Sequence, residues 1–142
     1  MILSFTIPGD PVSWARPRKR GQGKGFYTAP RQAAYADVVA SLALEARPRG
    51  WDASLPMRVE LVANFRRGPA CVKAGHDRHH FHPTPKRYDV DNLLKLVLDG
   101  LVGVALEDDG LVVSAQVVKQ CGTQAYTWVS LRPAEASLQT SS

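Results

Sequence analysis

The chain has 142 residues, 44% of them hydrophobic, and a net charge of +5 at pH 7. This length suits one domain with a modest core and excludes two, and the positive charge favours a polyanionic partner. Two cysteines provide neither a disulfide framework nor a C-x-x-C zinc motif. The start lacks the features of a signal peptide and no apolar run is long enough to span a membrane, so we expect a cytoplasmic protein without a disulfide.

The N-terminal part of the chain predicts a strand, a basic loop and a helix. Residues 2–7 alternate between apolar and polar side chains, as a half-buried strand does. Residues 12–30 are rich in arginine, lysine and glycine, with aromatic residues between them. Such a loop either follows a phosphate backbone and stacks on an unpaired base or is solvated and pinned to the core by its aromatics. Residues 31–46 have a partly helical apolar spacing that ends before Pro48 and Gly50.

The middle of the chain predicts a second strand and a second basic loop. Residues 57–65 alternate as a strand, although Val62 makes the second face less polar. Residues 66–87 are irregular and basic, and they include the pattern H-x-x-H-H-x-H from His76 to His82. We disfavour a zinc site there because Cys71 is the only nearby cysteine. A loop of this length is unusual unless it is functional or disordered, so we interpret it as a flexible DNA-contacting loop.

Basic side chains gather in these two loops, whereas the acidic residues gather later in the chain. Lysine and arginine side chains of this kind hold a nucleic-acid backbone. The candidate DNA-binding residues are Arg16, Arg18, Lys19, Arg20, Lys24, Arg66, Arg67, Lys86 and Arg87.

The segment from Arg87 to Asp109 predicts the central helix. Its apolar residues recur at helical spacing, so one stripe should pack against a core. Asp91, Lys95 and Asp99 are spaced i, i+4, i+8 and should share one exposed edge. The predicted stripe consists of Val90, Leu93, Leu94, Val97, Leu98, Leu101 and Ala105. Leu96 and Val102 lie outside this stripe. We expect them to contact either a broader core or a partner subunit.

Four carboxylates border this helix, and each has a structural explanation of its own. Asp89 can cap the helix. Asp91 can interact favourably with the helix dipole or pair with Lys95. Asp108 and Asp109 can form a turn before a strand. Taken together, however, two acids in D-x-D spacing repel each other unless a cation lies between them. Mg²⁺ prefers carboxylate oxygens, and it can bind a phosphate oxygen and lower the pKa of an attacking water.

The C-terminal part predicts two more strands. Residues 111–120 and 125–131 alternate, and the short link at Gly122 and Thr123 favours a hairpin between them. Residues 133–142 should form a flexible tail. The order β-α-β-α-β-β predicts an α+β protein, in which residues 1–132 form a single two-layer domain. We expect two helices and a small mixed sheet of about four strands.

The motifs D-V-D-N-L-L-K and L-E-D-D-G-L-V-V resemble those of the RusA-type Holliday-junction resolvases, which are small homodimeric Mg²⁺-dependent endonucleases. The resemblance is strongest over residues 87–118. It implies that Asp89, Asp91 and Asp109 are catalytic carboxylates that bind Mg²⁺, or Mn²⁺ as a substitute, with Asp108 as a weaker metal ligand. It also implies that Lys95 is the essential cation beside them. We expect Asn92 to support the site by orienting a carboxylate or a phosphate oxygen.

The resemblance implies a homodimer that resolves four-way DNA junctions by paired symmetric phosphodiester hydrolysis, in recombination and repair or in phage DNA processing. One alternative is a Mg²⁺ nuclease that acts on flaps or single strands. A second is a non-catalytic basic DNA-binding module whose acidic residues only cap the helix. A third is a zinc-stabilised interaction protein built on the histidine loop.

Overall fold

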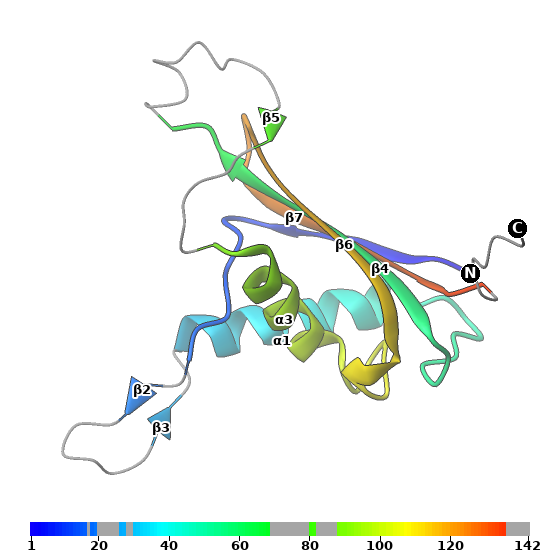
Figure 1. Ribbon diagram of the computed structural model, residues 1–142. Helices are drawn as coiled ribbons and strands as arrows, with labels where there is room; N and C mark the ends of the chain where they lie inside the picture. Colours follow the sequence, from blue (N-terminus) through cyan, green and yellow to red (C-terminus); the bar gives the residue numbers. More distant parts are fainter. Residues whose placement is uncertain (17, 20–25, 28–29, 69–79, 82–87, 136–142) are drawn as a thin grey trace, which may run out of the picture.

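A five-stranded mixed sheet in the order β1-β7-β4-β6-β5 is covered on one face by two helices (Figure 1). The computed structural model describes residues 1–16, 18–19, 26–27, 30–68, 80–81 and 88–135. The strands of the sheet are β1 (Leu3–Pro8), β4 (Met57–Arg66), β5 (His80–Phe81), β6 (Val112–Gly122) and β7 (Tyr126–Pro133). The helices are α1 (Pro30–Ala46), α3 (Val90–Leu101) and the short 3-10 helix η2 (Asp109–Leu111).

The main elements confirm the predicted α+β class and the order β-α-β-α-β-β. The predicted loops 12–30 and 66–87 are not wholly irregular, because the first contains two very short strands and the second contains the short strand β5. In the first, β2 (Arg18–Lys19) pairs with β3 (Phe26–Tyr27). In the second, β5 pairs with the end of β6. Strands of two residues are too short to leave a periodic pattern in the sequence.

The predicted hairpin between the last two strands is wrong, because β4 lies between them. β4 runs parallel to β6 on one side and antiparallel to β7 on the other. The three residues after Gly122 therefore carry the chain around the end of β4 to its opposite side. The side-chain amide of Asn64, near the end of β4, donates to the carbonyl of Gln124 and secures this crossing.

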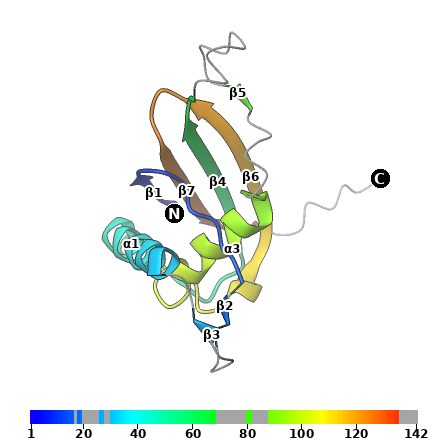
Figure 2. The same cartoon turned by 90° about the vertical axis from the view of Figure 1, so that its left-hand side faces the viewer.

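The core lies between the helices and one face of the sheet (Figure 2). Alternate residues of the central strands are buried, as a sheet covered on one side requires. Examples are Val59 and Leu61 on β4 and Val129 and Leu131 on β7, each at most 1% exposed. No helix of the described residues lies on the other face of the sheet, so the residues of that face form a separate surface.

The two helices approach each other closely at Gly100 of α3. A Cβ atom at this position would lie 2.6 Å from the Val39 Cβ and 2.7 Å from the Ala36 carbonyl oxygen of α1. A side chain here would collide with backbone as well as with a β-branched neighbour. The glycine therefore sets the distance between α1 and α3, and with it the position of α3 over the sheet.

The buried face of α3 differs in part from the predicted apolar stripe. Leu96 is 2% exposed and belongs to the core, so the suggestion that it faces a partner subunit is wrong. Val90, which was placed on the stripe, is 45% exposed. The helix ends at Leu101, but Ala105 is still fully buried in the turn that follows. Val102 is 40% exposed.

Several predictions concern residues at the margins of the described chain. β7 extends to Pro133, where the flexible tail was expected to begin, while residues 136–142 lie outside the described residues. Cys121 is buried and takes part in no disulfide, and Cys71 lies outside the described residues. In the part of the chain that the structure describes, no helix is long and apolar enough to cross a membrane.

Candidate active site

The first turn of α3 is anchored to the sheet by an aromatic pair. The rings of Tyr88 and Phe65, at the end of β4, meet edge to face with centroids 5.0 Å apart. The next residue, Asp89, takes the N-cap position with an extended backbone, and its carbonyl accepts from the Leu93 N–H. Its side chain makes no capping hydrogen bond. The N-cap alternative therefore does not account for this carboxylate.

Asp91, Lys95 and Asp99 all lie on the exposed edge of α3, as their spacing predicted. The alternative of an Asp91–Lys95 ion pair is not realised: no carboxylate of the described residues comes within 4.0 Å of the Lys95 amine. Instead, Lys95 Nζ lies 3.5 Å from the centroid of the Trp14 ring. The lysine is thus exposed, with an aromatic ring against its amine.

The segment after β1 brings Trp14 to this edge. The Trp14 N–H donates to the Asn92 carbonyl over 3.0 Å, which ties the segment to the first turns of α3. Pro11 and Val12 are buried just before it, and the indole packs half-buried against the core. Asn92 thereby receives a structural role through its backbone, while its predicted supporting role through the side chain stays a prediction.

The turn that follows α3 is held by the link between α1 and β4. Trp51 is 6% exposed, and its indole N–H donates to the Ala105 carbonyl over 3.0 Å. The Glu107 N–H donates to the Ala53 carbonyl over the same distance. These two hydrogen bonds hold the turn in place on the link between α1 and β4. They therefore also fix the position of the backbone from which Asp108 and Asp109 follow.

The two acids of the D-D motif differ in their surroundings. The Asp108 carboxylate accepts from the Gly110 N–H over 2.9 Å and caps η2, as the turn alternative proposed. A Cβ at Gly110 would lie 2.6 Å from that carboxylate oxygen, so a side chain here would require the Asp108 carboxylate to move. Asp109 is exposed in the first turn of η2. Of the two, Asp109 has the side chain that the local fold does not use.

Asp99 is a carboxylate that the candidate set omitted, although its position on the exposed edge was predicted. Partial burial raises the pKa of Asp99, the nearby Lys95 ammonium opposes this, and the charge of Asp109 raises the pKa further. These interactions place Asp99 between the lysine and the D-D motif. Its i+4 spacing from Lys95 was the sequence signal that could have added it to the set.

The acids therefore form two groups along α3, with Lys95 between them. Asp89 and Asp91 lie at the N-terminal end, and Asp99 lies near Asp109 at the other. At 1.5 Å per residue, Asp91 and Asp99 are about 12 Å apart along the helix axis. Consistently, no three His, Cys, Asp or Glu side chains in the described ranges are grouped closely enough to hold a metal ion.

The predicted DNA-binding residues are only partly described. Arg16 is exposed, Arg66 is exposed at the end of β4, and Arg67 is half-buried. Arg18 and Lys19 form β2, although nothing is described of their side chains. The other candidates are Arg20, Lys24, Lys86 and Arg87, which lie outside the described residues, as do His76, His79 and His82.

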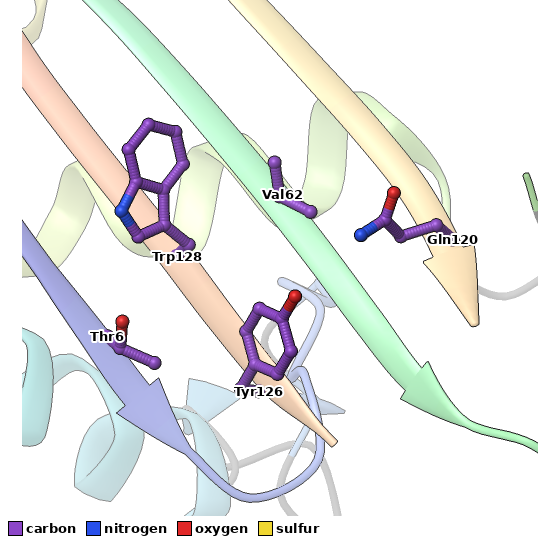
Figure 3. Close-up of a pocket in the computed structure, with 5 residues that line it drawn as sticks. All are labelled: Thr6, Val62, Gln120, Tyr126 and Trp128. Carbon is purple, nitrogen blue, oxygen red and sulfur yellow. The ribbon is translucent and has the colours of Figure 1, made fainter. Parts of the chain in front are cut away.

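A second surface lies on the face of the sheet that carries no helix. A hollow of about 390 Å³ is lined there by Thr6, Val62, Gln120, Tyr126 and Trp128 (Figure 3). These residues come from the adjacent strands β1, β7, β4 and β6. An aromatic and apolar centre on an open sheet face has the character of the core of a protein interface.

The fold and the charge pattern define a class: a small basic α+β domain that carries exposed carboxylates and one lysine along a single helix. The net positive charge suits contact with a phosphodiester backbone. The comparison with family models narrows this class. The model of the endodeoxyribonuclease RusA family matches residues 8–132, nearly the whole chain, and the chain belongs to this family. A search of curated proteins gave no significant match. Membership confirms the resemblance and implies an endonuclease that acts on Holliday-junction DNA.

Proposed function

We propose that the protein is a Mg²⁺-dependent resolvase that cleaves four-way junctions by paired symmetric hydrolysis, in recombination and repair or in phage DNA processing. The observation that carries this proposal is the exposed edge of α3. There, Asp89 and Asp91 have no capping hydrogen bond or ion pair among the described residues, and the Lys95 amine lies against an aromatic ring. Family membership supports the endonuclease class, and the edge supports the assignment of the chemistry to these residues.

Asp89, Asp91 and Asp109 would hold one or two Mg²⁺ ions between them, since all three are exposed carboxylates. Asp108 is the weaker candidate because its carboxylate already accepts the Gly110 N–H. The donor chemistry suits Mg²⁺, which is commonly bound by one or two carboxylates, waters and substrate phosphate oxygens rather than by a closed protein cage. The spread of the acids along α3 fits this open mode better than a single three-carboxylate site. When bound, the metal would supply a water of lowered pKa and a counter-charge for the phosphate.

Lys95 would bind the non-bridging oxygens of the scissile phosphate and stabilise the negative charge that grows there in the transition state. An ammonium is a compact charge with three rotatable donors, so it can follow the oxygens as their geometry changes. Asn92 would orient a carboxylate or a phosphate oxygen. The basic loops would hold the junction arms through contacts to the phosphate backbone of the DNA, which carry little sequence information.

The paired cleavage calls for two active sites, and a two-fold homodimer provides them. We place the second copy on the open sheet face, with the hollow around Trp128 at the centre of the contact (Figure 3). Two features support this choice. The centre of that face is aromatic and apolar, and α3 lies on the other face of the sheet, so both acidic edges remain accessible to DNA.

The proposal is tested with a synthetic four-way junction and a linear duplex of matched sequence, each incubated with and without Mg²⁺. We expect symmetric paired nicks on the junction alone, only with the metal. Asp91→Asn should reduce cleavage by at least about a hundredfold while junction binding persists, because the carboxamide keeps the shape but loses the charge that binds the metal. Glu107→Gln, an exposed acid next to the D-D motif, serves as the control and should cleave like the wild type.

The outcomes separate the alternatives. Cleavage of flaps or single strands in preference to the junction would support the alternative nuclease. Tight junction binding without cleavage in Mg²⁺ or Mn²⁺, unchanged in Asp91→Asn, would favour the non-catalytic DNA-binding module. Zinc found in the purified protein by elemental analysis would favour the interaction protein.

A further inference from the structure

The indole of Trp14 is the group that contacts the amine of Lys95. The 3.5 Å between Lys95 Nζ and the ring centroid is well inside the roughly 6 Å over which the face of an aromatic ring attracts a cation. Every carboxylate of the described residues is more than 4.0 Å from the amine. Among the residues described, the ring is therefore the contact that defines where the ammonium lies.

The ring is itself held in place from two sides. The backbone N–H of Trp14 donates to the Asn92 carbonyl over 3.0 Å, which fixes the tryptophan to α3 at a point three residues before Lys95. The indole also packs against the core and is half-buried. The half-buried ring is thus held at the position that Lys95 reaches from the following turn.

We propose that Trp14 is a positioning residue for Lys95, which holds the ammonium on the exposed edge between Asp91 and Asp99. This inference rests on the proposed function, in which Lys95 stabilises the charge on the scissile phosphate. The lysine side chain has a flexible four-carbon stem and loses rotamer entropy when it is fixed. A ring face restricts the ammonium without neutralising it, whereas a carboxylate partner would compete with the phosphate for its charge.

The geometry is tested first, without reference to activity, by NMR of the full chain. The ring current of Trp14 should move the Lys95 ε-CH₂ protons upfield in the wild type. Trp14→Leu keeps an apolar side chain but removes the ring, so the upfield shift should disappear; Trp14→Phe should keep part of it. The Lys119 ε-CH₂ signals are the internal control and should not move. An unchanged Lys95 shift in folded Trp14→Leu overturns the proposal.

The positioning role is tested by single-turnover cleavage of the four-way junction with Mg²⁺. Trp14→Leu should slow cleavage roughly two- to fivefold, which is the rate equivalent of an exposed cation–π contact, with the junction Kd unchanged. Trp14→Phe should recover most of the rate. Equal losses in both variants, or a loss in junction affinity rather than in rate, would show that the indole only packs and would overturn the proposal. If the wild type cleaves no junction, the proposed function fails while the NMR result still decides the contact.

Discussion

Asp99 is the carboxylate on α3 whose protonation the fold perturbs. Its pKa is raised above the ordinary value of 3.8, first by partial burial. A raised pKa means that folding favours the protonated form, so the associated stability is present below the unfolded-state pKa and is lost as the pH rises through the folded-state pKa. At neutral pH the ionised carboxylate therefore costs stability. Such a cost is retained in proteins when the charge serves a function.

We therefore predict that Asp99→Asn is slightly more stable than the wild type at pH 7, by no more than about 0.5 kcal/mol, the scale of a surface substitution. The difference in stability between the two proteins should shrink as the pH falls toward 4, because the wild-type Asp99 carboxyl becomes protonated and then no longer destabilises the folded state. Thermal unfolding of both proteins over pH 4 to 7 measures this. A Tm difference that is constant across the range would contradict the electrostatic explanation, and Glu107→Gln provides the comparison at an exposed acid.

The sequence predicted where several candidate site residues lie on the fold but not their individual surroundings. The D-x-D-N-x-x-K spacing was sufficient to place Asp91 and Lys95 on one edge, because helical spacing is local. Nothing in the D-D motif indicates that Asp108 caps η2 while Asp109 stays exposed, since either acid can take a turn position. The contact between Trp14 and Lys95 could not be predicted either, because it joins distant parts of the chain through tertiary packing.

At the scale of elements, the close approach of α1 and α3 depends on Gly100. We predict that Gly100→Ala destabilises the protein by about 1–2 kcal/mol. Alanine favours a helix over glycine by about 1 kcal/mol. However, the added Cβ would meet the Ala36 carbonyl at 2.7 Å, and only a shift of one helix relieves that contact. Overpacking should therefore outweigh the helix propensity.

Urea unfolding of Gly100→Ala measures this cost as a lower midpoint with an unchanged slope. Gly68→Ala is the matched control, because no described atom lies within 4 Å of a Cβ added there. Its midpoint should stay close to that of the wild type. A Gly100→Ala protein as stable as the wild type would mean that α1 and α3 can separate without cost.

The main helices and strands could be predicted because each has its own periodic pattern, but their pairing could not. The three residues between β6 and β7 have the length of a hairpin loop, and local evidence favours a hairpin. β4 instead takes the central position, where its backbone pairs with β6 on one side and β7 on the other and its residues Leu61 and Ala63 are buried. The order of the strands is determined by the packing of the whole sheet against α1 and α3, and a local sequence pattern carries no information about that packing.

The whole molecule has two unlike sides. α1 and α3, with the acidic edge of α3, lie on one face of the sheet (Figures 1 and 2), whereas the other face is left open around Trp128 (Figure 3). The sequence suggested Leu96 or Val102 as residues that face a partner, but Leu96 is in the core. Val102 remains exposed on the helical side. The proposed dimer thus has two candidate surfaces, and they can be separated by substitution.

We predict that the wild type sediments at twice the chain mass and that Trp128→Glu sediments as a monomer. A carboxylate at the centre of the hollow would be buried against the partner without a matching cation, and the cost of such a charge exceeds that of a lost apolar contact. Val102→Glu places the same charge on the helical side and should remain dimeric. Because Trp128 is only half-buried in one chain, the monomer should keep its circular dichroism spectrum.

The opposite result, in which Val102→Glu is a monomer and Trp128→Glu remains a dimer, would show that the interface lies on the helical side. A wild type that is monomeric at micromolar concentration would refute the dimer. If the dimer forms through the open face, Trp128→Glu should also convert paired cleavage of the junction into single nicks, since each chain keeps its own acidic edge but loses the second site.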